Sequence, residues 1–117
     1  MTKFFLMPLC LLLAGSGVAA AQQPPAQQGD ATNGHRLWMA DGCYQCHGTV
    51  AQGGVGPRLA PDPLPAEAIA AYIRAPVNVM PPYTDTVLND AGVADIQAYL
   101  ATIPPPPKLQ DIPLLAR

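Results

Sequence analysis

The chain has 117 residues, of which 50% are hydrophobic, and its six basic and eight acidic side chains give a formal net charge of −2. That length is enough for one domain. Proteins that bind nucleic acid carry a basic patch or stripe, and the acidic balance excludes that class of partner.

Residues 1–21 have the layout of a secretory signal peptide. Lys3 precedes an unbroken apolar run over residues 4–13, and small residues follow that run. The run is too short to span a bilayer, and Ala19 and Ala21 fit the small-x-small cleavage rule. We expect cleavage after residue 21 and a periplasmic mature chain; an uncleaved membrane anchor is the alternative.

Removal of this signal peptide lowers the cysteine count. Cys10 lies in the apolar run and leaves with it, so the mature chain keeps only Cys43 and Cys46. We expect no membrane span in the mature chain, whose net charge is −3. So short a chain buries only part of the surface that its unfolded form exposes. A bound group would help to complete its core.

Residues 22–30 are rich in Gln, Pro and Ala, and they predict a flexible leader because they have little to bury. The helical pattern that follows has Thr32 or Asn33 as its N-cap and runs into Cys43. Gly34 sits early in this helix, where a glycine costs about 1 kcal/mol relative to alanine. A close crossing with another helix would explain its presence.

The rest of the chain alternates between Gly/Pro-rich loops and two further helices. Residues 48–64 hold four glycines and three prolines and predict a long loop, and long ordered loops usually have something to wrap. Residues 65–76 predict a short helix that Pro76 ends. After a second irregular loop, residues 89–103 predict a helix capped by Asn89.

This pattern predicts an all-α domain over residues 31–103, with about three helices and no strand of useful length. The tail over residues 104–117 begins as polyproline and ends apolar. Its apolar side chains could form a docking strip beyond a stiff spacer. A tail that folds over its own domain, or a disordered end, is the alternative.

The chemistry of the chain centres on residues 43–47, Cys-Tyr-Gln-Cys-His. Zinc sites of this kind need a second pair of ligands at similar spacing, and beyond the motif only the distant His35 remains. A thioredoxin-type redox site should open a helix beside a βαβ unit, and no strands are predicted. Covalent haem attachment, for which Cys-x-x-Cys-His is the signature, is the favoured interpretation, with a lone disulfide as the weaker one.

One covalently attached haem c accounts for the spacing of this motif. One helical turn brings Cys43 and Cys46 to the same side, where each sulfur can form a thioether with a haem vinyl group. His47, next in line, can then bind the iron. The haem would also complete the core and give the long loops something to wrap.

The second axial ligand is predicted to be Met80. Met39 and His35 precede the motif on the helix that leads into it, on the His47 side of the ring, and neither can easily cross the haem plane. Met80 lies in a proline-stiffened loop 33 positions beyond His47; a methionine that only fills an apolar gap is the alternative. A His/Met pair leaves no open iron position, which favours electron transfer over catalysis.

With these features in place, the chain resembles the class I c-type cytochromes of bacteria, the small single-haem electron carriers, over about residues 31–103. The stretch NGHRLWMADGCYQCHG resembles the family's first helix and haem site, and GVGPRLAP resembles its proline-containing loop. The stretch MPPYTDTVLNDAGVADIQAYL is similar to its Met loop and last helix. The resemblance implies a cytochrome c fold wrapped around one covalent haem.

The resemblance also implies the roles of individual residues. Cys43 and Cys46 would form the thioethers, and His47 and Met80 would bind the iron from opposite faces. The backbone carbonyl of Pro57 would accept a hydrogen bond from the other nitrogen of His47, which fixes the orientation of the ring.

Two further residues follow from the same resemblance. Leu59 would line the haem crevice, and Arg58 would lie near a propionate or remain a solvated charge. Gly34 would lie where the first helix crosses the last one. The stretch between His47 and Met80 is short for the family, which implies a more exposed haem edge.

Three functional interpretations remain open. The first is a periplasmic one-electron carrier between a dehydrogenase and another cytochrome or an oxidase, and not an enzyme. The second is a tightly bound cytochrome subunit of a flavin or molybdenum dehydrogenase complex. The third, from another class, is a haem sensor or peroxidase-like protein, which requires an open iron position. Because the mature chain has one lysine, docking to a partner should depend little on long-range charge.

Overall fold

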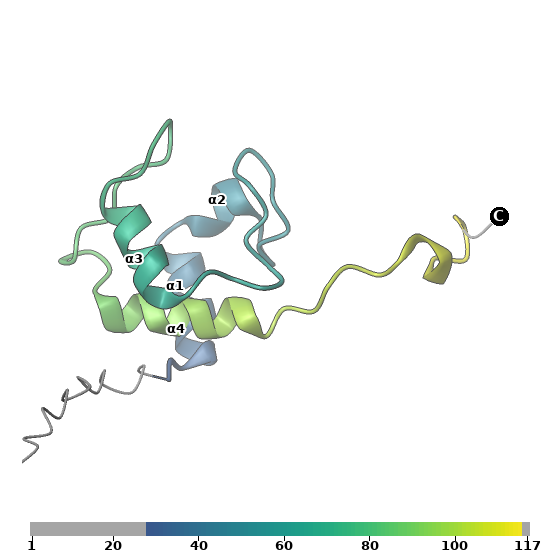
Figure 1. The fold of residues 1–117 in the computed structure, drawn as a ribbon, viewed down its shortest axis with the longest axis horizontal. Helices are drawn as coiled ribbons and strands as arrows, with labels where there is room; N and C mark the ends of the chain where they lie inside the picture. The colour runs from purple at the N-terminus through teal and green to yellow at the C-terminus, as the bar shows by residue number, and fades with distance from the viewer. Residues whose placement is uncertain (1–27, 116–117) are drawn as a thin grey trace, which may run out of the picture.

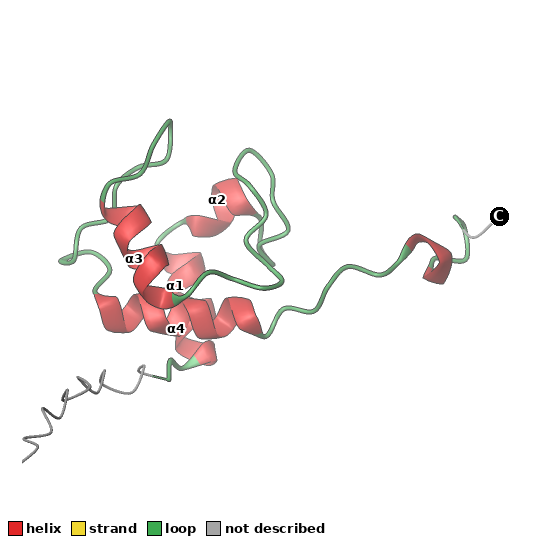
Figure 2. Cartoon of the chain, in the orientation of Figure 1, coloured by secondary structure: helices red, strands yellow, loops and turns green. Residues whose placement is uncertain are grey.

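The computed structural model describes residues 28–115, and within that range the chain forms helices and loops without strands (Figure 2). The elements are α1 (Ala31–Ala40), α2 (Cys43–His47), α3 (Ala66–Arg74), α4 (Asp90–Ala101) and the short 3₁₀ helix η1 (Leu109–Asp111). The all-α class predicted from the sequence is confirmed. The signal peptide predicted over residues 1–21 lies outside the described residues.

The first predicted helix is divided in two, which corrects the sequence-based expectation. We expected one helix that runs into Cys43, but α1 ends at Ala40 and α2 begins at Cys43. Gly42 between them has a left-handed φ of 78°, which a continuing right-handed helix does not allow. Within residues 28–115 the break therefore gives four α-helices, where about three were expected.

The helix caps agree with the sequence in one case and differ in the other. α4 is capped by Asn89, as expected, because its side-chain oxygen accepts a hydrogen bond from the Gly92 N–H at 2.9 Å. α1 is capped by Asp30 and not by Thr32 or Asn33. The Asp30 carboxylate accepts from both of their backbone N–H groups, at 2.8 and 3.3 Å, which places a negative charge at the positive end of the helix.

Helices α1 and α4 cross closely and form the base of the domain (Figure 1). A Cβ atom built on Gly34 would overlap the backbone carbonyl of Asp95, so only glycine fits at this crossing. The Asp95 carboxylate fastens the contact, since it accepts from the Asn33 side-chain amide and from the Asp30 N–H, each at 2.7 Å. The crossing explains the glycine that the helix otherwise tolerates poorly.

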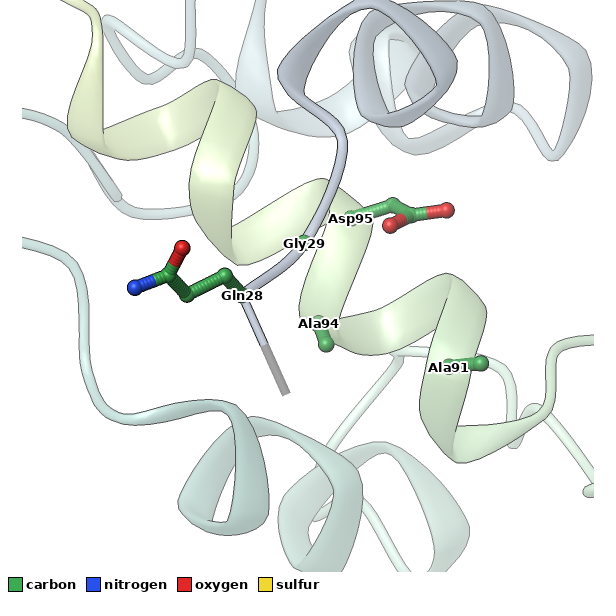
Figure 3. A pocket seen from close by; sticks show the side chains of 5 residues that line it. All are labelled: Gln28, Gly29, Ala91, Ala94 and Asp95. Atoms are coloured by element: carbon green, nitrogen blue, oxygen red, sulfur yellow. The ribbon is translucent and has the colours of Figure 1, made fainter. Parts of the chain in front are cut away.

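Residues 28–30 are the described part of the predicted leader, and they lie along α4. A small pocket lies between this segment and the helix, and Figure 3 shows the side chains that line it. Its volume is about 180 Å³. It is lined by Gln28, Gly29, Ala91, Ala94 and Asp95. Its one charged group, Asp95, already holds the two hydrogen bonds at the helix crossing. The described residues that line the pocket therefore include no free charged group with which to bind a ligand.

The hydrophobic core lies between α1, α3 and α4. Its largest fully buried side chains are Trp38, Val93 and Leu100, each no more than 2% exposed. Two long loops, over residues 48–65 and 75–89, connect α2 to α3 and α3 to α4. The tail leaves the end of α4 and runs away from the helices to η1 (Figure 1). No helix within residues 28–115 is both long and apolar enough to cross a membrane.

Candidate haem site

A cavity of about 830 Å³ lies among α2, α3, α4 and the two long loops. Its volume falls within the ~300–1,000 Å³ typical of cofactor and ligand sites. Much of its wall is apolar and comes from the hydrophobic core. The structure places all seven predicted site residues on this wall: Cys43, Cys46, His47, Pro57, Arg58, Leu59 and Met80.

The two thiols lie one helical turn apart on α2, and both line the cavity. They are free thiols, so they form no disulfide with each other. Burial, followed by the negative charge of Asp41, raises the pKa of the Cys43 thiol to about 11. Redox-active dithiols instead have a thiol whose pKa is lowered, so this environment does not suit a thioredoxin-type site.

The imidazole of His47 is held in one orientation. It is 8% exposed, and its Nδ1 lies 2.8 Å from the backbone carbonyl of Pro57. A carbonyl can only accept, so Nδ1 carries a proton, and in the neutral ring Nε2 has the lone pair that can bind a metal. Gly56 lies against the ring, since a Cβ built there would come within 2.8 Å of Cε1 and Nδ1.

The loop that supplies Pro57 is fastened to the end of α2. The last carbonyl groups of a helix have no partner within it. Here the N–H of Gly53 donates to the His47 carbonyl and the N–H of Gly56 donates to the Cys46 carbonyl, each at 2.8 Å. These two hydrogen bonds therefore hold the loop that carries Pro57 against the imidazole of His47.

Met80 reaches the same cavity from the second loop. Its side chain is half-buried and packs against the hydrophobic core. The chain that follows is held to α3, because the Tyr83 N–H donates to the Ile73 carbonyl at 2.8 Å. Arg74 donates to the Tyr83 carbonyl at 2.9 Å and forms an ion pair with Asp90 at 3.0 Å. These bonds anchor the Met80 loop to α3 and α4.

The two rejected ligand candidates lie away from this cavity. His35 is exposed on α1, with its ring centroid 4.8 Å from that of Tyr99. Met39 is 36% exposed on the same helix. Neither residue lines the cavity, whereas Met80 does.

Sequence reasoning missed three residues that build the site. Gly56 supports the imidazole, Tyr83 anchors the Met loop, and Asp41 lies on the cavity wall just before the first cysteine. The sequence offered two signals. Tyr83 is an aromatic residue three positions after Met80, and Asp41 is an acidic residue two positions before Cys43. Neither residue type has a fixed role at such positions, so only the fold reveals their contacts.

The residues of the cavity fit a haem c. Two thiols one turn apart can form thioethers, and a thioether sulfur and an imidazole nitrogen can bind iron. The apolar wall suits a porphyrin ring. Within the described residues, no group of three or more His, Cys, Asp or Glu side chains could hold a metal ion.

Comparison with known proteins supports this assignment. The family model described as "Cytochrome C oxidase, cbb3-type, subunit III" matches residues 29–100, which is more than half of the chain. No curated protein and no solved structure matches the chain. The chain therefore belongs to this family and is a c-type cytochrome domain that binds haem c covalently.

Proposed function

We propose that the chain is a single-haem, one-electron carrier that works in the periplasm. It accepts electrons from a dehydrogenase and passes them to another cytochrome or an oxidase. The membership of a c-type cytochrome family supports electron transfer, and the layout of residues 1–21 supports export. The observation that carries the proposal is that one cavity gathers Cys43, Cys46, His47 and Met80 on its wall.

Four side chains bind the cofactor in this proposal. Cys43 and Cys46 hold it through thioether bonds, and His47 Nε2 and the Met80 sulfur bind the iron. The haem supplies a reversible one-electron change at its iron. Two protein ligands leave no iron position for a substrate. The protein therefore acts as a carrier and not as an enzyme.

The remaining predicted residues support this arrangement. Pro57 fixes the imidazole through the hydrogen bond at 2.8 Å, and a hydrogen bond of this kind makes the metal-binding nitrogen more basic. Leu59 contributes an apolar contact to the cavity wall. Arg58 is exposed at the same wall and supplies a cation to a haem propionate.

The proposal is tested by maturation in a host that attaches haem c. The pyridine haemochrome spectrum should give one haem per chain with both vinyl groups saturated. The oxidised protein should show the weak far-red band of a methionine–iron bond. Met80→Ala should abolish that band and let the reduced protein bind carbon monoxide rapidly, whereas the control Met39→Ala should do neither. Rapid binding of carbon monoxide by the unaltered protein would instead support a haem sensor or a peroxidase-like protein.

The tail favours a second candidate, a cytochrome subunit fixed in an oxidoreductase complex. Leu109 and Leu114 are 70% and 82% exposed beyond the proline spacer, and the tail runs away from its own domain (Figure 1). Such a strip could dock on a flavin or molybdenum dehydrogenase, and the description of the family adds a terminal oxidase as a host.

Deletion of residues 108–117 tests this candidate. If the protein is a fixed subunit, the tagged, haem-loaded full chain should co-purify with an oxidoreductase, and the deletion should abolish the association without changing the haem spectrum. Removal of residues 116–117 alone is the control. Equal recovery of the partner with and without the tail would contradict a docking role.

A further inference from the structure

Asp41 has an unusual position on the wall of the haem cavity. It lies in the turn between α1 and α2, two positions before Cys43. Its Oδ2 atom is shielded from solvent and has no hydrogen-bond partner, and it is the one such side-chain atom found within residues 28–115. A buried carboxylate oxygen without a partner is costly, which suggests a use beyond stability.

Two backbone hydrogen bonds keep Asp41 in this position. Its N–H donates to the Leu37 carbonyl at 2.8 Å and so closes the end of α1. Its carbonyl accepts from the hydroxyl of Tyr83, also at 2.8 Å. Because both backbone groups are engaged, the backbone of Asp41 is fixed where the motif meets the Met loop.

No cation neutralises this carboxylate in the described part of the chain. The ion pairs there join Arg74 to Asp85 and Asp90. Arg58, the one basic side chain on the cavity wall, is exposed and so is screened by water. Asp41 also lies close enough to Cys43 to add to the burial that raises the pKa of that thiol.

We propose that Asp41 sets the reduction potential of the haem, because its carboxylate stabilises the oxidised form. The oxidised iron carries one more positive charge than the reduced iron, so a fixed negative charge beside it favours oxidation. Asp41 is half-buried with one oxygen shielded from solvent, so its charge is screened less by salt than a fully exposed charge. The inference rests on the proposed haem site and adds to it a residue that tunes the potential of the haem.

The test compares Asp41→Asn with Asp62→Asn by spectroelectrochemistry of the haem-loaded full chain. At the potential where the unaltered protein is half reduced, Asp41→Asn should show a ratio of reduced to oxidised haem at least ~3-fold higher. Asp62 is also on the cavity wall but is exposed, so Asp62→Asn should change the ratio less. The Asp41→Asn effect should persist at 0.5 M salt, roughly where exposed charges are screened.

Further variants separate charge from structure. Asp41→Glu keeps the charge and should stay near the unaltered ratio, and Asp41→Ser gives a second neutral side chain should Asp41→Asn mature poorly. If the unaltered chain does not bind haem, the proposed function itself is wrong. A haem-loaded Asp41→Asn protein with an unchanged or lower potential, or an equal shift in Asp41→Glu, would overturn the role of Asp41 alone.

Discussion

The hydroxyl of Tyr83 donates a hydrogen bond to the backbone carbonyl of Asp41 at 2.8 Å, across 42 positions of sequence. It joins the loop that carries Met80 to the turn that precedes Cys43. The two proposed iron ligands come from segments far apart in the chain, and this bond is a direct polar link between those segments. The geometry of the site therefore depends on a contact outside the ligand set.

Removal of the Tyr83 hydroxyl should weaken the bond between Met80 and the iron. A hydrogen bond of this kind contributes about 0.5–1.5 kcal/mol, so in Tyr83→Phe the far-red band should disappear at a lower temperature than in the unaltered protein. Tyr72→Phe is the control, because Tyr72 also lines the cavity but is 46% exposed. An unchanged melting profile of the band in Tyr83→Phe would show that the link does not hold the loop.

A side chain at position 56 should disturb the imidazole of His47. The Cβ of Gly56→Ala would press on the ring, and overpacking of this kind typically costs about 1–3 kcal/mol. We expect a lower denaturant midpoint and an altered haem spectrum. Val55→Ala, at a neighbouring side chain that is 87% exposed, should change neither. Equal stability of the two variants would mean that the loop can move away from the ring.

The sequence predicts the chemistry of this site better than its supporting contacts. The cysteines and His47 follow from a local motif with a fixed spacing, and Met80 follows from elimination among few candidates. Contacts such as Tyr83 with Asp41, or Gly56 with His47, join segments whose approach depends on the whole fold. The break before Cys43 was not predicted because Leu37, Trp38 and Tyr44 have the spacing of one helical face. The φ angle becomes positive at Gly42 between them.

Tyr99 should make the stability of the protein fall at alkaline pH. Burial raises the pKa of its phenol above the ordinary value of 10.0, and its hydroxyl donates to the Thr49 carbonyl at 2.9 Å. The folded chain then holds this proton more tightly than the unfolded chain. The stabilisation is complete below the unfolded pKa of about 10 and is lost as the pH rises through the folded pKa.

This pH effect is measured by NMR of ¹³Cζ-labelled tyrosine together with denaturant unfolding. Tyr99→Phe should remove one late-titrating signal and should flatten the fall of unfolding free energy above about pH 10. A Tyr99 signal that titrates at or below the ordinary phenol value would contradict the prediction, as would an equally steep fall in Tyr99→Phe.

Electron exchange between two copies of this protein should depend weakly on salt. The wall of the haem cavity carries exposed apolar side chains, among them Val55 and Val79 at 87% and 91% exposure, and Arg58 is its one basic residue. Long-range steering needs a charged face. The self-exchange rate, measured by NMR line broadening, should therefore change less than ~3-fold between 10 and 300 mM salt.

A charge placed at Val79 on the wall of the haem cavity should create the salt dependence that the natural surface lacks. In Val79→Glu, two copies that approach through their haem edges would repel each other, so exchange should slow at low salt and recover as salt screens the charge. Val79→Ala removes the same apolar side chain without adding charge and should keep a weak salt dependence. A steep dependence in the unaltered protein, or none in Val79→Glu, would mean that electrons leave through another face.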